Sequence, residues 1–432
     1  MQTKLQGIAN KAKQNKKYRF RDLFRLIDEE ALIGAWKLLN KRAVAGIDKV
    51  TAKEYEENLK ENIERIVGNL KKKRYRAKMV RRAYIPKGKG KMRPLGIPAV
   101  EDKLIQIVVA QILNAIYEQD FTPNSFGYRK SRNPHQAIQQ ITEKLQYGMY
   151  NYIVEADIKG FFDNMNHEWI IQMLEQRIDD RAFIWLIKKW LKAGVVEEDG
   201  KVIHPITGSP QGGIVSPVIA NIYLHYALDL WFEKKVKTAS RGEAYICRYA
   251  DDFICAFRYE ADADKFYRTL ETRLNKFNLE LSKEKTNIIQ FSRYRIGQNG
   301  RFDFLGFEFR WAISRTKKRI VKKRTSTKKL EKSINNFTQW CRTILSMRLK
   351  DIFKTLNIKL RGYYNYYGII GNFKSLAKFF YRSMKILFKW LKKKSYKKRL
   401  NWSKFNRWTE IYGICKPRII YSRFQQQEFC FV

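Results

Sequence analysis

Residues 244–257 read AYICRYADDFICAF, an Asp pair between two apolar runs. The runs Ala244–Cys247 and Phe253–Phe257 have the length and composition of short buried strands. The segment therefore predicts a β-hairpin with Asp251 and Asp252 at its turn. Asp is common at turns for local reasons, but two uncompensated carboxylates beside apolar strands are costly. The rest of the chain has to decide between a plain turn and a chemical site.

A second apolar strand is predicted at Tyr152–Val154, and it runs into Asp157. Helices are predicted at about residues 167–177, after the N-cap Asn166, and at about residues 262–277. Carboxylates that converge from different strands suit two-metal nucleotidyl transfer, in which two cations about 4 Å apart activate the attacking hydroxyl and hold the triphosphate. Mg²⁺ prefers such oxygen ligands and completes its octahedron with phosphate and water.

The flanking segments mix helices with short strands. Residues 21–70 and the strongly apolar residues 99–117 have helical periodicity. Between them, residues 81–98 predict a hairpin with a basic, glycine-rich tip. A short strand is predicted at residues 302–309, and the chain reads as helical from about residue 328 to residue 398. This mixture predicts an α+β fold.

The charge of the chain points to a polyanionic partner. The 432 residues include 87 Lys and Arg against 42 Asp and Glu, a formal net charge of +45. Such a body repels itself unless nucleic acid or another polyanion neutralises it. Residues 352–409 contain no carboxylate, and their basic side chains alternate with aromatic rings, a composition suited to phosphate contacts and base stacking. The alternative is a solvated basic surface over an ordinary aromatic core.

The cysteines and apolar runs limit the cellular setting. The five cysteines form no CxxC pair, and the four histidines lack metal-ligand spacing, so we expect neither a zinc module nor a disulfide framework. No apolar run approaches the roughly 18 residues of a membrane span. The N-terminus lacks the apolar core of a signal peptide. We expect a reducing, cytoplasmic location, with an organellar presequence as the less favoured alternative.

Seven segments resemble motifs of one polymerase family, in order along the chain. Arg248–Phe253 resembles the YxDD box in its YADD form, Tyr152–Asn166 the strand that supplies the first catalytic Asp, and residues 208–217 (GSPQGGIVSP) the PQG box. The other matches are Ala83–Pro98 with the fingers hairpin, Thr122–Arg132 with the SFGFRPGR segment, Leu281–Thr286 with the Lys-bearing box and Phe304–Phe307 with the primer-grip turn. The chain therefore resembles the reverse transcriptases encoded by group II introns, and group II-like bacterial enzymes.

The resemblance implies a right-hand polymerase with fingers, a ferredoxin-like palm and a helical thumb. It implies the following division: an N-terminal helical extension at residues 1–60, fingers at 61–150, a palm with an inserted fingers segment at 151–312, a helical thumb or maturase-like RNA-binding domain at 313–400, and a basic C-terminal segment of unknown role at 401–432.

The resemblance also implies the chemistry of the carboxylates. Asp157 and Asp251 would be the principal ligands of two Mg²⁺ ions, which Mn²⁺ could replace, and Asp252 would be the third carboxylate. The main chain at Ile158 would lie beside the metal-bound triphosphate. Lys285 would protonate the pyrophosphate leaving group as a general acid.

Four further residues are expected to contact the nucleotide. Phe162 falls where the family places a ring against the ribose 2′ position, which favours deoxynucleotides over the ribonucleotides of an RNA-copying RNA polymerase. Gln211, in a glycine-rich turn, would approach the nascent base pair. Arg93 and Lys87 suit the triphosphate, as a bidentate fork and a point charge. The alternatives are a core aromatic for Phe162 and solvated side chains for the two cations.

Three functional interpretations follow from these expectations. The first is a group II intron reverse transcriptase and maturase that binds its structured intron RNA and copies it into DNA, with an RNA template, a DNA or RNA primer and dNTPs as partners. The second is a free-standing group II-like reverse transcriptase in antiphage defence, copying a dedicated noncoding RNA. The third is an RNA-binding splicing factor with little polymerase activity. The sequence lacks the His and CxxC clusters of an HNH endonuclease, so we expect target cleavage to come from elsewhere. The oligomeric state stays open.

Overall fold

The computed structural model describes residues 1–88, 91–208, 212–297, 300–394 and 400–421. The chain divides into two compact units. The first consists of Met1–Ile141 and Tyr152–Ile288, and the second of Thr142–Asn151 and Ile289–Val432. The chain passes between the units within helix α6 (Pro134–Tyr147), between Asn151 and Tyr152, and within strand β10 (Asn287–Gln290). The domain boundaries that the sequence suggests stay a prediction.

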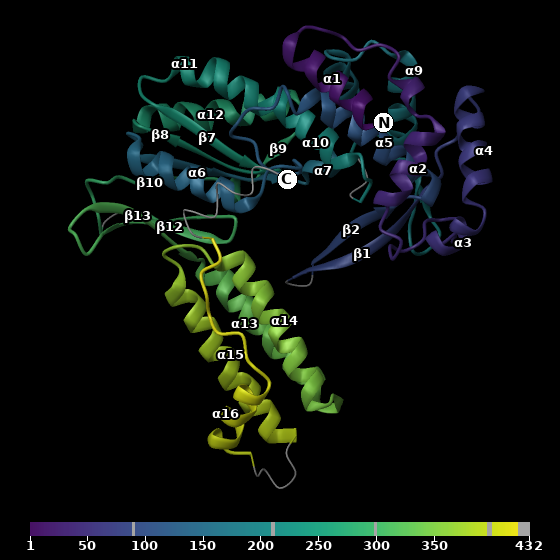
Figure 1. Ribbon diagram of the computed structural model, residues 1–432. Coiled ribbons are helices and arrows are strands. Elements are labelled where there is room, and N and C mark those ends of the chain that lie inside the picture. Colours follow the sequence, from purple (N-terminus) through teal and green to yellow (C-terminus); the bar gives the residue numbers. More distant parts are fainter. Residues whose placement is uncertain (89–90, 209–211, 298–299, 395–399, 422–432) are drawn as a thin grey trace. The chain divides into compact units, whose positions relative to one another are not determined.

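Helix α5 (Val100–Tyr117) is the centre of the first unit. Leu104, Val108 and Ile112 on this helix have no exposed surface. Helix α5 confirms the helix predicted at residues 99–117. Three other helices pack against α5: α1 (Gln2–Gln14), α2 (Glu29–Leu38) and α10 (Ser216–Leu224) (Figure 1). The other helices are α3 (Ala52–Glu57), α4 (Leu59–Lys71), α7 (Phe161–Asn164), α8 (His167–Glu175), α9 (Arg181–Leu191), α11 (Lys237–Ala239) and α12 (Glu260–Lys276). The Asn166 carboxamide accepts the Trp169 N–H at 3.0 Å, the N-cap that the sequence predicted for α8.

The first unit contains two larger sheets. One has the order β2-β1-β5-β6 and is built from β1 (Val80–Gly88), β2 (Lys91–Ile97), β5 (Val195–Val196) and β6 (Val202–Ile203). The other has the order β10-β3-β8-β7 and includes β3 (Tyr152–Ala156), β7 (Ala244–Tyr249) and β8 (Asp252–Phe257). Helix α12 packs on β3 and β8. A small ladder joins β4 (Ile158–Lys159) to β9 (Glu280–Leu281). The predicted α+β class and both hairpins are confirmed.

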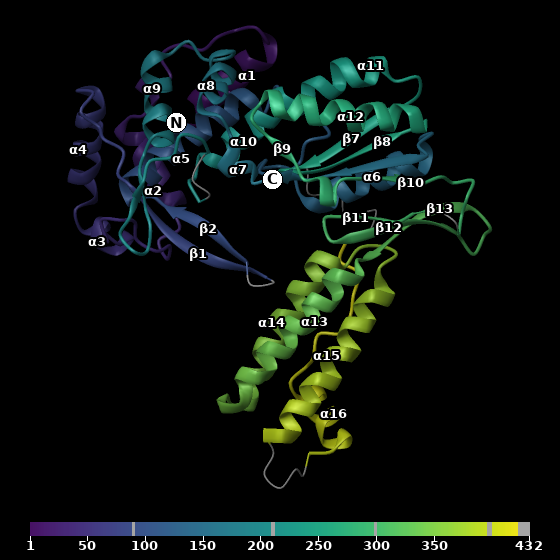
Figure 2. The same cartoon turned by 180° about the vertical axis from the view of Figure 1, so that it is seen from behind.

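The second unit joins a three-stranded sheet to a helical bundle. Its strands are β11 (Phe302–Phe304), β12 (Phe307–Ile313) and β13 (Arg319–Thr325), and its helices are α13 (Thr327–Thr343), α14 (Leu349–Tyr367), α15 (Phe373–Lys394) and α16 (Trp402–Ile411). The strand predicted at residues 302–309 is two strands, because Leu305 and Gly306 have φ values of 50° and 81° and turn the chain within the segment that resembles the primer-grip turn. The helical prediction beyond residue 328 is confirmed as far as Lys394 by α13, α14 and α15, and residues 395–398 lie outside the described residues (Figures 1 and 2).

Helix α16 was not predicted from the sequence. Its residue Phe405 is 1% exposed in the same apolar cluster as Leu360 and Leu387 of the bundle. Trp402 stacks on Phe388 with ring centroids 3.9 Å apart. The described part of the C-terminal segment therefore belongs to the core of the second unit. No described helix is both long and apolar enough to cross a bilayer.

Candidate active site

Strand register brings the three predicted carboxylates to one end of the central sheet. In the β7–β8 hairpin Tyr249 pairs with Asp252, so Ala250 and Asp251 form the turn, and Ala250 has a left-handed φ of 58°. Strand β3 pairs antiparallel with β8, and its last pair is Ala156 with Phe253. The next positions along these two strands are Asp157 and Asp252. Asp157 follows the last residue of β3 and Asp252 is the first residue of β8, so both lie at the same end of this sheet.

A cavity of about 500 Å³ lies at this end of the sheet. Most of the residues predicted for the site line it: Arg93, Asp157, Ile158, Phe162, Asp251 and Lys285. Asp252 begins β8 with an exposed side chain and is not part of the wall. Gln211 and the side chain of Lys87 lie outside the described residues. Gly212, which follows Gln211, does reach the cavity wall.

Lys285 makes an ion pair with the first carboxylate of the site. The β4–β9 ladder pairs Ile158 with Leu281, and the Ser282 N–H donates to the Asp157 carbonyl at 2.8 Å. The following turn then places Lys285 Nζ 2.5 Å from Asp157 Oδ2. The hydrogen bond to Asp157 holds the pKa of the Lys285 ammonium above its ordinary value, and Asp252 and Asp251 act in the same direction. Lys285 is therefore a cation at neutral pH.

The donor set has the chemistry of a magnesium site but not its closed geometry. Asp157 and Asp251 offer carboxylate oxygens on the cavity wall, the ligands that Mg²⁺ prefers. The Lys285 ammonium on Asp157 shows that this carboxylate holds a cation. Among the described residues, however, no three His, Cys, Asp or Glu side chains are arranged to hold a metal ion. Joint coordination by three Asp residues requires their side chains to move together.

A buried ion-pair network, which could not be recognised in the sequence, holds the turn formed by Ala250 and Asp251 (the Asp turn). Arg248 is fully buried, and its guanidinium donates to the Asp229 carboxylate at 2.7 and 2.5 Å. It also donates to the Asn221 side-chain oxygen and to the Ala250 carbonyl, both at 3.0 Å. Asp229 lies in η2 (His225–Asp229), a π-helical segment that continues α10. In the sequence, this network is indicated only by two polar residues, Asn221 and Asp229, within the largely apolar residues 218–232.

The loop that resembles the SFGFRPGR segment packs against the same turn. The Asn221 amide donates to the Gly127 carbonyl at 2.6 Å. A Cβ at Gly127 would lie 2.2 Å from the backbone nitrogen of Ala250, so only glycine allows this approach. Ser125 in this loop also forms an isolated parallel β-bridge with Arg248. Network and loop together fix the backbone that carries Asp251.

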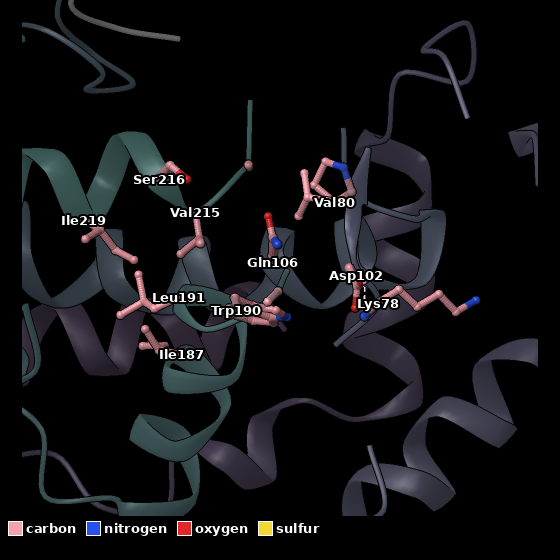
Figure 3. Close-up of a pocket in the computed structure, with 13 residues that line it drawn as sticks. Lys78, Val80, Asp102, Gln106, Ile187, Trp190, Leu191, Val215, Ser216 and Ile219 are labelled. Atoms are coloured by element: carbon pink, nitrogen blue, oxygen red, sulfur yellow. Dashed lines mark hydrogen bonds between the residues drawn. The ribbon is translucent and has the colours of Figure 1, made fainter. Parts of the chain in front are cut away.

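A second, much smaller cavity is structural. Figure 3 shows Gln106, Asp102 and Trp190 around it, together with Val215. Its volume of about 20 Å³ is that of a single water molecule. Gln106 Oε1 accepts the Ile214 N–H at 2.9 Å, which fastens the described part of the PQG box to α5. Burial raises the pKa of Asp102 to about 6.

The sheet β10-β3-β8-β7, the carboxylates at its end and the basic β1–β2 hairpin are the features of a right-hand polymerase. Residues 85–309, just over half of the chain, match the family model described as reverse transcriptase (RNA-dependent DNA polymerase). The chain therefore belongs to the reverse transcriptase family. Members of this family use divalent metal ions such as Mg²⁺ and act on RNA templates.

Three relatives illustrate the match. The chain is 32% identical over 403 residues to the group II intron-encoded protein LtrA of Lactococcus lactis subsp. cremoris, covering 74% of this chain and 66% of that protein. It is 32% identical over 279 residues to protein YkfC of Escherichia coli, covering 56% and 71%. It is 35% identical over 170 residues to a putative COX1/OXI3 intron 1 protein of Saccharomyces cerevisiae, covering 39% and 20%. The chain thus spans slightly less than two thirds of the first relative.

Proposed function

We propose that this chain is an RNA-directed DNA polymerase that binds a structured RNA and copies it into DNA. The observation that carries the proposal is the single cavity that collects Asp157, Asp251, Phe162 and Arg93 from separate elements of a reverse transcriptase fold. A splicing factor with a vestigial polymerase would have no need to keep this set together.

In the proposed mechanism the chain binds, orients and discriminates. Asp157 and Asp251, with Asp252 as third carboxylate and the main chain at Ile158, would hold two Mg²⁺ ions, or Mn²⁺ in their place. Bound there, the ions supply activation of the primer hydroxyl and neutralisation of the triphosphate. Lys285, once released from its ion pair with Asp157, would donate its proton to the pyrophosphate leaving group.

Side chains of the cavity wall would select the nucleotide. The Arg93 guanidinium pairs with the triphosphate, helped by Lys87 on the same hairpin. The ring of Phe162 excludes a ribose 2′-hydroxyl, and Gln211 contacts the nascent base pair.

A group II intron role fits the chain best. The relative LtrA is a group II intron-encoded protein, and an Arabidopsis thaliana relative, 28% identical over 176 residues, is a nuclear intron maturase. We therefore infer that the RNA is an intron and that the protein assists its splicing as a maturase. These relatives do not favour a defence polymerase. Cys247, Cys255, Cys341 and Cys415 are free thiols, which supports a reducing compartment such as the bacterial cytoplasm.

The RNA itself tests this proposal. The protein is purified from its host, and the RNA bound to it is sequenced together with new complementary DNA. We expect RNA that flanks the reading frame and folds as an intron, with DNA copies of it. A separate short RNA with matching DNA would instead establish a polymerase dedicated to one template, and RNA without any DNA copy would contradict polymerase activity.

One exposed side of α15 carries the charge expected of an RNA-binding thumb. Lys374, Lys378, Lys385 and Lys389 are all exposed and recur at helical spacing. Replacing all four by Gln should reduce the slope of log K against log salt by about 3, because each phosphate contact contributes roughly 0.7 to 0.9. Binding to the intron RNA at several salt concentrations measures this slope.

A matched variant removes the same charge from the other unit. It replaces four exposed lysines by Gln: Lys37, Lys53, Lys60 and Lys71. We expect a smaller change of slope than for the α15 variant. An equal change in both variants, or a slope near zero in the unaltered protein, would contradict a dedicated thumb surface.

A further inference from the structure

Tyr128 occupies an unusual backbone conformation on the cavity wall. Its φ is 59°, a left-handed value that bulky residues rarely adopt, and its side chain is 46% exposed. It lines the same cavity as Phe162 and Asp251. Backbone strain of this kind persists only where the surroundings hold it, and it concentrates at functional sites.

Both neighbours of Tyr128 are fixed to the protein. The Gly127 carbonyl accepts a hydrogen bond from the Asn221 side-chain amide, and Gly127 packs directly against Ala250 in the Asp turn. Arg129 is 7% exposed, and its guanidinium donates to the Glu118 carboxylate at 2.6, 2.9 and 3.1 Å. It also donates to two carbonyls of its own loop. The direction in which Tyr128 leaves the backbone is therefore set by buried contacts.

The ring that Tyr128 presents to the cavity contacts Phe162. The two ring centroids are 6.3 Å apart and the planes are inclined by 76°, an edge-to-face arrangement. On another side Phe162 contacts Phe161, at 5.4 Å and 66°, and Phe161 is 3% exposed in the core. Phe162 is thus held between a core ring and the ring of Tyr128. Burial raises the pKa of Tyr128, and the Asp251 charge adds to this, so the phenol stays neutral.

A ring can exclude a hydroxyl group only if it cannot move aside. Phe161 supports Phe162 from the core, and Tyr128 is the aromatic contact that supports it from the cavity wall. We propose that Tyr128 is a positioning residue for sugar selection, which braces Phe162 in the orientation that rejects a ribose 2′-hydroxyl. This inference rests on the proposed function, because it assumes that Phe162 meets the sugar of an incoming nucleotide.

The test compares deoxy- and ribonucleotides in single-nucleotide extension on a primed RNA template. The measured quantity is the ratio of kcat/KM for dNTP to that for rNTP. Tyr128→Ala should lower this ratio about 10-fold, and Tyr128→Phe, which keeps the ring, should stay within about 2-fold of the unaltered protein. A ring that served only as a base platform would change both nucleotides equally and leave the ratio constant.

A double variant shows whether Tyr128 acts through Phe162. In a Phe162→Ala background, adding Tyr128→Ala should change the ratio by less than about 2-fold, because the braced ring is already gone. Tyr147→Ala is the matched control, since Tyr147 is 76% exposed and does not line the cavity. Tyr128→Leu, of similar bulk but without a ring, replaces Tyr128→Ala if the latter does not fold.

Each outcome decides between the inference and its premise. An unchanged ratio in Tyr128→Ala or Tyr128→Leu, while Phe162→Ala lowers it, overturns the brace and leaves the proposed function standing. Effects that multiply in the double variant also overturn the brace. No DNA synthesis by the unaltered protein contradicts the proposed function and the inference together, whereas no effect of Phe162→Ala contradicts the sugar-selecting role of Phe162 and, with it, the inference.

Discussion

Replacing Asp251 and Asp252 together by Ala should lower the rate of DNA synthesis on a primed RNA template by about 10³-fold or more. The reason is the loss of the carboxylates with which the β7–β8 turn would hold the divalent ions. Primer extension with dNTPs and Mg²⁺ measures the rate. Affinity for RNA should stay within about threefold or increase, because the lost carboxylates can only repel phosphate. Synthesis by the unaltered protein should stop with a chelator and return with Mg²⁺ or Mn²⁺.

The matched control removes an adjacent acidic pair elsewhere in the same unit. Glu198 and Asp199 lie exposed between β5 and β6, so replacing both by Ala changes the net charge equally. The control variant should keep its DNA synthesis. Synthesis above about one tenth of normal in the Asp251 and Asp252 variant would refute the two-metal assignment.

Local patterns were sufficient to predict the elements that carry the site. Alternation of apolar strands around Asp251 predicted the β7–β8 hairpin, and the run of residues 99–117 predicted α5. The antiparallel pairing of β3 with β8 then fixes the position of Asp157, which directly follows the last paired residue of β3. Arg93 on β2 and Phe162 on α7 line the same cavity, as the family resemblance implied.

Contacts across long stretches of chain could not be predicted in this way. Lys285 was expected at the leaving group, but the structure pairs it with Asp157, 128 residues away. The Arg248 network joins residues 19 and 27 positions apart, and only the folded chain shows that their polar atoms meet. Helix α16 was missed for a related reason, because its burial of Phe405 depends on a bundle formed earlier in the chain.

Arg248→Met should lower the free energy of unfolding by about 3–5 kcal/mol, because it leaves the buried Asp229 carboxylate without its partner. Urea denaturation followed by tryptophan fluorescence measures this change. The double variant Arg248→Met with Asp229→Leu replaces the ion pair by apolar side chains and should return to within about 1 kcal/mol of the unaltered protein. The stability effect is thus expected to be reversible by the second substitution.

DNA synthesis should not return with stability in the double variant. Arg248 also donates to the Ala250 carbonyl in the Asp turn, and neither Met nor Leu can replace that bond. Since a shift of about 1 Å at a reacting centre costs about 100-fold, synthesis should remain at least about tenfold below normal. The control is a second ion pair, between the buried Arg177 and the partly buried Asp120 at 3.0 Å, which lies outside the cavity wall.

This control distinguishes an ion pair that only stabilises the fold from one that also positions the Asp turn. The corresponding double variant, Arg177→Met with Asp120→Leu, should keep synthesis wherever it keeps stability, because Arg177 donates to carbonyls of the N-terminal segment rather than to the turn. If the Arg248 variant with Asp229→Leu regained both stability and synthesis, its network would be ordinary core packing. If stability alone returns, the Arg248–Asp229 pair is needed to position Asp251 at the cavity. That role explains why an ion pair occupies this otherwise apolar core.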